Sequence, residues 1–314
     1  MAGKIFITGG TGFIGKFLIG RIIGTWPMRV LTRHNVVAAK SSIPYVTYVH
    51  GDIMSPESLI RGMRGCSYVI HMAAKVSFNQ KDDKTVRESI ITGTRNVVSI
   101  AEKMGVHTLI YVSSAIVKGA SKSPEDLRDE TFSSNYECAY VKAKKDAERI
   151  VNNSKINNVC VLYPTNCRSD LYAKEFCENS LIKYTSGGNN IIDPEDVCSG
   201  ILRSLHCTGR TNYIIGGHNV SYFEIFKTLQ EISEKKKIMV PVHPALRHFI
   251  KSFAMNGSWY LTPFIVDTAF AYKYYDTSKA RKNINLIPEY QMITTLRRGL
   301  ELYERRSGNK QTAL

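Results

Sequence analysis

Residues 4–15 read KIFITGGTGFIG, and this stretch decides the fold of the chain. Lys4–Thr8 is a short apolar run typical of a buried strand, and a helical pattern follows the glycines. Gly9 permits a tight turn, Gly12 lets the backbone approach a ligand, and Gly15 allows close packing of helix on strand. The N-terminus of such a helix offers unpaired N–H groups and a partial positive charge to phosphates. The stretch therefore predicts a turn that binds the pyrophosphate of a dinucleotide; a glycine turn kept only for packing is the alternative.

Short apolar runs alternate with helical patterns through the first half of the chain, and the pattern loosens after Pro164. Apolar strands that alternate with helices form a parallel sheet covered on both faces. Ser55 and Pro56 start one helix, and Ser221 with Glu224 forms a capping box at another. Strands are expected at 4–8, 29–32, 46–50, 68–72, 108–113, 158–162 and 211–215, and helices at 16–24, 55–63, 84–104, 136–152, 193–205 and 221–235.

This order of elements predicts an α/β fold: a doubly wound, Rossmann-type parallel sheet with a smaller C-terminal lobe. Residues 1–164 form the expected dinucleotide-binding domain, and residues 190–216 return to it. Residues 165–314 mainly form the expected substrate-binding lobe, and the tail from 307 to 314 is expected to be frayed.

Composition favours a folded enzyme-sized protein over a nucleic-acid or metal-binding one. The 314 residues are 43% hydrophobic and carry a net charge of +15, but the basic residues are spread out and no DNA- or RNA-binding motif accompanies them. The seven cysteines form no C-x-x-C pair, so no zinc or redox framework is expected; they indicate small core residues of a reduced, cytoplasmic protein. The most apolar late stretch, 249–272, is interrupted by charged residues and falls short of the ~20 residues of a membrane span.

Further motifs follow the glycine turn in a fixed order. They are Gly51-Asp52-Ile53, His71-Met72-Ala73-Ala74, Ser113-Ser114-Ala115, Tyr140-x-x-x-Lys144, Ile192-Asp193-x-x-Asp196-Val197 and the stretch 274–281. Together they cover nearly the whole chain, and the chain resembles the extended short-chain dehydrogenase/reductases, the family of NAD-dependent epimerases and dehydratases. HMAAKVSF at 71–78 resembles the dihydroflavonol-reductase-like branch of that family.

The end of the second expected strand bears on cofactor choice. An NAD-preferring site places an acidic residue there for the ribose 2′-hydroxyl, but this chain reads Leu31-Thr32-Arg33-His34. The guanidinium fork of Arg33 suits a 2′-phosphate, so NADP(H) is favoured and NAD(H) remains possible. Arg33 stacked on adenine or turned to solvent is the alternative, and Asp52 is expected beside adenine. The resemblance implies cofactor contacts from Gly9, Thr11, Gly12, Phe13, Ile14, Gly15, Arg33, Asp52, Ile53, Ala73, Ala74, Lys75, Tyr140, Lys144 and Pro164.

Tyr140 and Lys144 have the spacing of a proton-donating pair. A tyrosine, with a pKa of about 10, must be shifted down to act near neutral pH, and a lysine one helical turn later favours the phenolate. Tyr275 and Lys279 share the spacing, but we expect them in the C-terminal lobe, where no cofactor reaches. The resemblance assigns Ser114 to hold the substrate carbonyl and leaves Ser113 a structural role.

Other positions have plainer interpretations or depart from the family. His71 is expected to be a packed core histidine rather than a catalyst. Ile90 stands where the family usually has Asn, which puts a solvent or proton relay there in doubt. The glycine-rich loop usual after Pro164 is missing, which implies a small pocket, an open pocket or a weakened enzyme. Aromatic residues of the C-terminal lobe line an apolar pocket or form its own core or lid: Phe249, Phe253, Trp259, Tyr260 and Phe264.

These features favour an NAD(P)-dependent oxidoreductase that reduces a ketone or aldehyde, or oxidises the alcohol, with Ser114, Tyr140 and Lys144 as catalytic residues. The alternative is an NAD-dependent epimerase or dehydratase of a nucleotide sugar, which uses the same three residues. A third hypothesis is a non-catalytic NADP-binding scaffold or sensor. The expected partners are a small-molecule substrate and a second copy of the chain, since the resemblance implies a homodimer through the two long helices of the nucleotide domain.

Overall fold

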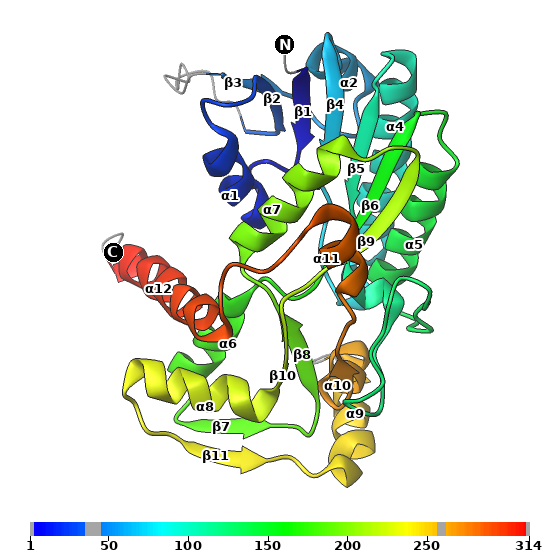
Figure 1. Cartoon of the computed structure of the whole chain (residues 1–314). Coiled ribbons are helices and arrows are strands. Elements are labelled where there is room, and N and C mark those ends of the chain that lie inside the picture. The colour runs from blue at the N-terminus through cyan, green and yellow to red at the C-terminus, as the bar shows by residue number, and fades with distance from the viewer. Residues whose placement is uncertain (1–2, 35–44, 256–261, 312–314) are drawn as a thin grey trace.

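The structure is a computed structural model that describes residues 3–34, 45–255 and 262–311. Its centre is one parallel sheet, shown in Figure 1. The seven strands run in the order β3 (Val46–His50), β2 (Met28–Thr32), β1 (Lys4–Thr8), β4 (Cys66–His71), β5 (Thr108–Val112), β6 (Asn158–Pro164) and β9 (Arg210–Ile215). The strands that follow β1 in the sequence, β2 and β3, lie on one side of it, and β4 lies on its other side. A crevice is therefore expected at the carboxyl ends of β1 and β4, where the strand order reverses.

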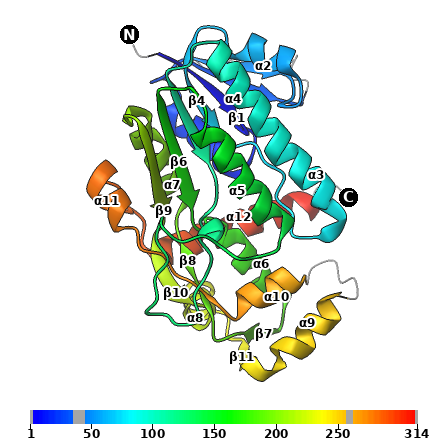
Figure 2. The same ribbon diagram turned by 90° about the vertical axis from the view of Figure 1, so that its right-hand side faces the viewer.

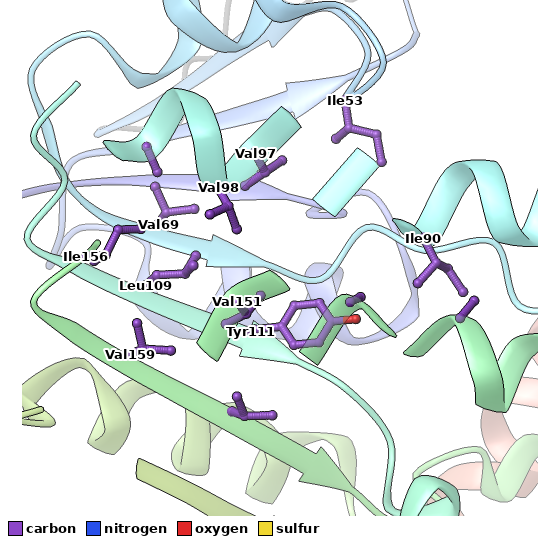
Figure 3. Packing of buried hydrophobic residues seen from close by; sticks show 14 of the residues in the cluster. Ile53, Val69, Ile90, Val97, Val98, Leu109, Tyr111, Val151, Ile156 and Val159 are labelled. Atoms are coloured by element: carbon purple, nitrogen blue, oxygen red, sulfur yellow. The ribbon is translucent and has the colours of Figure 1, made fainter. Parts of the chain in front are cut away.

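Alternating residues of each strand face opposite layers of helices, as the twofold period of a strand requires. Phe6 packs with α2 (Pro56–Met63), α4 (Gly93–Lys103) and α5 (Ala139–Asn152), in the cluster that Figure 3 draws around Val69, Leu109 and Val159. Ile5 packs with α1 (Phe13–Ile22) and α7 (Pro194–Arg203) on the other face. The α/β class and the parallel sheet are confirmed.

The long helix expected at 84–104 forms with one irregularity. It consists of α3 (Asp83–Arg87), a π-helical segment at Glu88–Thr92 and α4, with helical backbone angles at each junction. A π-turn adds a residue to the helical turn and is common at functional sites. Ile90 lies within this segment and is fully buried in the core, as Figure 3 shows.

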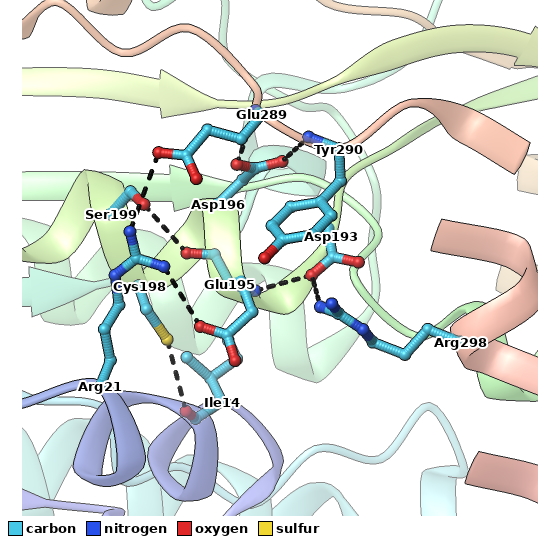
Figure 4. A network of polar contacts seen from close by, with 10 residues as sticks. All are labelled: Ile14, Arg21, Asp193, Glu195, Asp196, Cys198, Ser199, Glu289, Tyr290 and Arg298. Carbon is cyan, nitrogen blue, oxygen red and sulfur yellow. Dashed lines mark hydrogen bonds and ion pairs between the residues drawn. The ribbon is translucent and has the colours of Figure 1, made fainter. Parts of the chain in front are cut away.

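Helix α7 is held in place by carboxylates at its N-terminus, in the network of Figure 4. Asp193 caps the helix by accepting from the Glu195 amide at 2.9 Å and pairs with Arg298. Asp196 accepts from the Glu289 and Tyr290 amides at 2.9 and 3.3 Å. These contacts give the Asp-x-x-Asp motif a structural role: it joins α7 to the C-terminal part of the chain.

The C-terminal part contains two smaller sheets. One has the order β10 (His218–Ser221), β8 (Gly188–Ile191), β12 (Tyr272–Lys273), and the other pairs β11 (Ile238–Pro241) with β7 (Leu181–Tyr184). Helices α6 (Ser169–Glu178), α8 (Tyr222–Ser233) and α12 (Met292–Gln311) pack around a separate apolar cluster that includes Phe176 and Leu296. The remaining helices are α9 (Arg247–Met255), α10 (Pro263–Ala269) and α11 (Ser278–Ile284). The domain boundaries at residues 164 and 190–216 stay predictions.

Several local expectations are now settled. Ser55 caps α2, and the reciprocal capping box of Ser221 and Glu224 is present. Several predicted ends are wrong by one to three residues, the largest differences being α1, which begins at Phe13 rather than 16, and α5, which begins at Ala139 rather than 136. Of the tail predicted to be frayed, residues 307–311 belong to α12, and 312–314 lie outside the described residues. Among the helices in the described ranges, none has the length and apolar character that crossing a membrane requires.

Candidate active site

A cavity of about 1330 Å³ follows the carboxyl ends of the sheet strands and extends to the smaller sheet. This volume covers both the expected cofactor region and the expected substrate region. Every residue predicted from the sequence to bind the cofactor or to act in catalysis lines it. These residues are Gly9, Thr11, Gly12, Phe13, Ile14, Gly15, Arg33, Asp52, Ile53, Ala73, Ala74, Lys75, Ser114, Tyr140, Lys144 and Pro164.

The glycine turn has the shape of a phosphate cradle. Gly9 has a φ of +76°, and a Cβ there would lie 2.7 Å from the Ala73 nitrogen, so only glycine fits. The Gly12 amide donates to the Gly9 carbonyl at 2.9 Å, and Gly12 is the N-cap of α1 without any side-chain cap. A Cβ at Gly15 would lie 2.3 Å from the Gly9 oxygen, which explains the close packing of helix on turn. The uncapped N-terminus of α1 thus opens on the cavity and fits the pyrophosphate of a dinucleotide.

The opposite part of this nucleotide site lies after β2 and β3. Arg33 is exposed and lines the cavity. Asp52 Oδ1 accepts from the Met54 amide at 2.9 Å, which orients the carboxylate beside the cavity. Ile53 is 8% exposed and packs on Gly93, where a Cβ would lie only 2.4 Å from its side chain.

Ser114, just after β5, and Tyr140 and Lys144, on α5, all line the cavity. Ser114 follows the carboxyl end of β5 and is half-buried. Tyr140 lies in the first turn of α5, where it is 6% exposed and packs against the ring of Phe78 at a centroid distance of 5.5 Å. Lys144 lies one turn further along α5 and is 2% exposed. Its Nζ donates to the Val112 carbonyl at 2.8 Å.

The pKa shifts differ from the sequence-based expectation. Burial raises the pKa of Tyr140 to about 12, and the neighbouring Ser114 hydroxyl offsets this only in part. Burial also lowers the pKa of Lys144 to about 8, against the opposing charge of Glu148. The prediction of a lowered tyrosine pKa is therefore wrong for the protein alone, because loss of hydration disfavours both charged forms. At neutral pH Tyr140 is a protonated acid beside a charged Lys144.

Glu148, a further turn along α5, was not predicted as part of the site. Its carboxylate accepts hydrogen bonds from Ser113 Oγ at 2.5 Å and from Tyr163 Oη at 3.2 Å. Lys118 lies over the Tyr163 ring at 4.3 Å. Burial raises the pKa of Glu148. The i, i+4 spacing from Lys144 was the signal that could have found it.

Neither His71 nor Tyr275 was expected to take part in catalysis. His71 is fully buried, its Nδ1 and Nε2 lie 2.7 and 3.0 Å from the hydroxyls of Thr8 and Thr94, and burial lowers its pKa to about 3. It is the packed core histidine that was predicted. Tyr275 follows β12 in the C-terminal part of the chain, as expected, and lines the same cavity as Tyr140. Its hydroxyl donates to the Gly119 carbonyl at 2.9 Å, whereas Lys279 turns away to Asn212, so these two residues form no second pair.

Comparison with known proteins identifies the family. Residues 6–186, more than half of the chain, match the model of the 3-beta hydroxysteroid dehydrogenase/isomerase family. The chain belongs to this family. It is 30% identical over 256 residues to a putative dihydroflavonol 4-reductase of Synechocystis sp., which covers 74% of this chain and 73% of that protein. It is 31% identical over 121 residues to human 3 beta-hydroxysteroid dehydrogenase type 7, a match that spans 36% of this chain and 33% of that protein.

Solved structures of nucleotide-sugar enzymes share the fold. The UDP-Glc/GlcNAc 4-epimerase of Campylobacter jejuni superposes with a TM-score of 0.79 at 14% identity and covers 97% of this chain and 100% of its own. The dTDP-glucose 4,6-dehydratase of Streptomyces venezuelae superposes with a TM-score of 0.76 at 18% identity and covers 97% and 98%. The protein is thus an extended short-chain dehydrogenase/reductase, an NAD(P)-dependent enzyme with the oxidoreductase chemistry of that superfamily.

The structure describes both departures from the usual family sequence. Ile90 is an aliphatic side chain within the core, so no polar relay runs through this position. Helix α6 occupies the chain after Pro164 where the family usually has a glycine-rich loop. Of the predicted pocket aromatics, Phe264 lines the cavity. Phe249 and Phe253 are 63% and 60% exposed, so they form neither pocket nor core, and Trp259 and Tyr260 lie outside the described residues.

The cysteines are only partly buried. Cys66, Cys160, Cys167 and Cys198 are buried as predicted, whereas Cys138, Cys177 and Cys207 are half-exposed.

A group of polar residues at the end of the cavity next to the smaller sheet was not predicted from the sequence. It consists of Asn166, Tyr172, Asn189, Tyr222 and Lys273. Nothing in their spacing signals a site, because they come from separate elements that only the fold brings together.

Proposed function

We propose that this protein is an NADP(H)-dependent reductase of a ketone or aldehyde. The observation that carries the proposal is the convergence of the phosphate turn with Ser114, Tyr140 and Lys144 in one cavity. The match over three quarters of the chain to a protein named as a putative reductase supports the same choice. The likeness to epimerases and dehydratases concerns the fold alone, at 14–18% identity.

In the proposed reduction, Ser114, Tyr140 and Lys144 each have a separate role. When bound, the reduced nicotinamide supplies the hydride for a carbonyl carbon. Ser114 donates a hydrogen bond to the carbonyl oxygen and holds it toward Tyr140. Tyr140 gives its phenolic proton to the oxygen as negative charge develops there. Lys144 keeps its positive charge below about pH 8 and favours the phenolate that remains.

The raised pKa of Tyr140 favours the reductive direction. An alkoxide is a stronger base than the phenolate of a tyrosine with a pKa of about 12, so the proton moves downhill from Tyr140 to the reduced oxygen. In the reverse direction the same tyrosine has to lose its proton first, which is costly near neutral pH. Oxidation of the alcohol is therefore expected to be the slower direction.

Cofactor preference rests on Arg33. Its exposed guanidinium lines the cavity beyond β2, and the strand ends without a carboxylate for the ribose 2′-hydroxyl. A guanidinium binds a phosphate through two parallel hydrogen bonds, so a 2′-phosphate is the matching group. NADP(H) is therefore favoured over NAD(H).

The test is a pair of titrations followed by a turnover assay. Purified protein is titrated with NADPH and with NADH, with nucleotide fluorescence as the readout. We expect tighter binding of NADPH and its oxidation in the presence of at least one ketone or aldehyde of a broad panel. Tightly retained NAD, or preference for NADH, would favour the epimerase hypothesis. Binding of neither nucleotide by protein free of retained cofactor would favour the scaffold hypothesis. The homodimer through α4 and α5 and the cytoplasmic location stay predictions.

A further inference from the structure

The end of the cavity next to the smaller sheet is polar, and it is built from elements that lie far apart in the sequence. Asn189 on β8 and Lys273 on β12 are register partners in neighbouring strands. Tyr172 comes from α6, Tyr222 from the first turn of α8, and Asn166 from the link between β6 and α6. All of them line the cavity that also contains Tyr140. We call them the distal cluster.

The distal cluster has more hydrogen-bond donors than acceptors. Asn166 Oδ1 accepts from the Arg168 amide at 2.9 Å, which fixes its Nδ2 toward Tyr172. Tyr172 Oη accepts from Asn166 Nδ2 at 2.9 Å and from Asn189 Nδ2 at 2.8 Å, so its own proton points elsewhere. If the amide of Asn189 is reversed, Tyr172 donates to it and the two N–H groups of Asn189 become spare instead. In both arrangements a donor is left for a ligand.

Lys273 adds a positive charge to the distal cluster. Among the described residues its ammonium has neither a hydrogen-bond acceptor nor an ion-pair partner, and it lies 5.5 Å from the centre of the Tyr222 ring. Burial lowers the pKa of Lys273, while the nearby Tyr172 hydroxyl acts in the opposite direction. A lysine held in this way gains from an anion that restores the interactions lost with water.

Two other cations of the cavity are already paired with carboxylates, and Lys144 donates to the Val112 carbonyl, whereas Arg33 lies at the opposite, nucleotide end. Lys75 pairs with Asp82 at 2.7 Å, and Arg168 pairs with Asp170 at 2.7 Å. The acidic residues that line the cavity are Asp52 and Glu88, which lie after β3 and in the π-helical segment. The protein therefore provides no carboxylate for Lys273 from the described lining, and the complementary charge has to come from a ligand.

We propose that the distal cluster binds an anionic oxygen group of the substrate, a carboxylate or a phosphate, through Lys273, Tyr172 and Asn189. This inference rests on the proposed function, since it takes NADP(H) and the substrate to occupy this cavity together. It assigns the substrate class: a carbonyl compound that carries an acid group remote from the reacting carbon. Charge-assisted hydrogen bonds from an ammonium and a phenol to such a group are about twice as strong as neutral ones.

The proposal is tested by binding to NADP(H)-saturated protein, so that the readout does not depend on turnover. The probes are straight-chain oxo acids, their methyl esters and the matching oxoalkyl phosphates, titrated by thermal shift and by the fluorescence of bound NADPH. A charged hydrogen bond contributes about 1.5–3 kcal/mol, so the better anionic series should bind about 10- to 100-fold more tightly than the esters. The series that binds more tightly identifies the group as carboxylate or phosphate.

Substitutions show whether the distal cluster causes the preference. Lys273→Met should abolish the difference between acid and ester, and Tyr172→Phe should reduce it. Lys227→Met is the matched control, because Lys227 lies on the exposed face of α8 and loses the same charge without lining the cavity. NADPH affinity and the melting temperature show that each variant is folded.

The outcomes separate this proposal from the proposed function. Equal binding of acids, phosphates and esters, binding of no probe, or an acid preference that survives in Lys273→Met overturns the anion site. Reduction of neutral carbonyl compounds with no preference for acids keeps the reductase and removes the anion site. Binding of acids that depends on Lys273, without reduction of any of them, keeps the anion site and removes the reductase.

Discussion

Lys144 Nζ donates a hydrogen bond of 2.8 Å to the carbonyl oxygen of Val112, the last residue of β5. The same strand end leads directly into Ser113 and Ser114. A lysine of α5 is thereby fixed to the strand that positions the serine expected to hold the substrate. The active-site geometry is thus built on a strand and a helix rather than on mobile loops.

Tyr140→Phe is expected to remove the proton donor and leave the packing intact. Reduction should fall by about 10²- to 10⁴-fold, the usual contribution of a general acid, while NADPH binds as before. Steady-state kinetics and fluorescence titration measure the two effects. Tyr303→Phe, on α12 and outside the cavity lining, serves as the control. Activity of Tyr140→Phe within a few-fold of the unmodified enzyme would rule out this role for Tyr140.

The pH dependence of reduction should follow Lys144. With its pKa lowered to about 8, Lys144 is charged at neutral pH and neutral in alkaline solution. The value of kcat/KM, which reports ionisations of the free protein, should be level below this point and decline above it. A profile that stays level through pH 9 and beyond would contradict the assignment.

Glu148→Gln tests the ionisation of Lys144 by removing the negative charge that raises its pKa. The carboxylate of Glu148 raises the pKa of Lys144, so its removal should move the alkaline decline of kcat/KM to lower pH. Glutamine can still accept from Ser113, which limits the structural change. Glu137→Gln removes the same charge from a side chain that is 83% exposed, and its profile should match that of the unmodified enzyme. An unchanged decline in Glu148→Gln would show that Glu148 only supports the structure.

Arg33→Gln should alter the choice between the two cofactors. Loss of a charged hydrogen bond to a 2′-phosphate costs about 1.5–3 kcal/mol, or about 10- to 100-fold in the dissociation constant of NADPH. Affinity for NADH should change little, because NADH lacks that phosphate. Equal losses for both cofactors would indicate that Arg33 stacks on adenine instead.

His71 should make the fold sensitive to acid. Its pKa is about 3 in the folded protein against 6.5 for an ordinary histidine, so between these values the unfolded chain binds more protons. The free energy of unfolding therefore contains a contribution that is complete above pH 6.5 and is lost as the pH falls toward 3, by at most ~1.4 kcal/mol per pH unit. Urea unfolding at several pH values should show a smaller acid dependence in His71→Asn. Identical slopes for the two proteins would refute this assignment.

Local patterns predicted the parallel α/β fold, and the residues that they suggested for cofactor binding all line one cavity. Gly9 has a backbone angle, and Gly15 a close backbone contact, that a side chain would disturb, so a local sequence pattern was enough to predict the turn. The caps at Ser55 and Ser221 depend on residues within one helical turn, and both are present. Two features that depend on long-range packing were not predicted: Tyr275 lines the cavity because of the path of the C-terminal chain, and α12 extends to Gln311.

The sequence by itself determined the parallel sheet, the phosphate turn and the residues at the carboxyl ends of its strands, because each depends on neighbours within a few positions. Only the tertiary structure decided the ionisation of Tyr140 and Lys144, since burial by distant elements removes the water that would solvate their charged forms. It also decided the distal cluster, where β8, β12 and α6 bring Asn189, Lys273 and Tyr172 to one wall of the cavity. The spacing of these residues along the chain does not predict that they lie together, because contacts between distant residues depend on how the helices and strands pack and not on their order in the sequence.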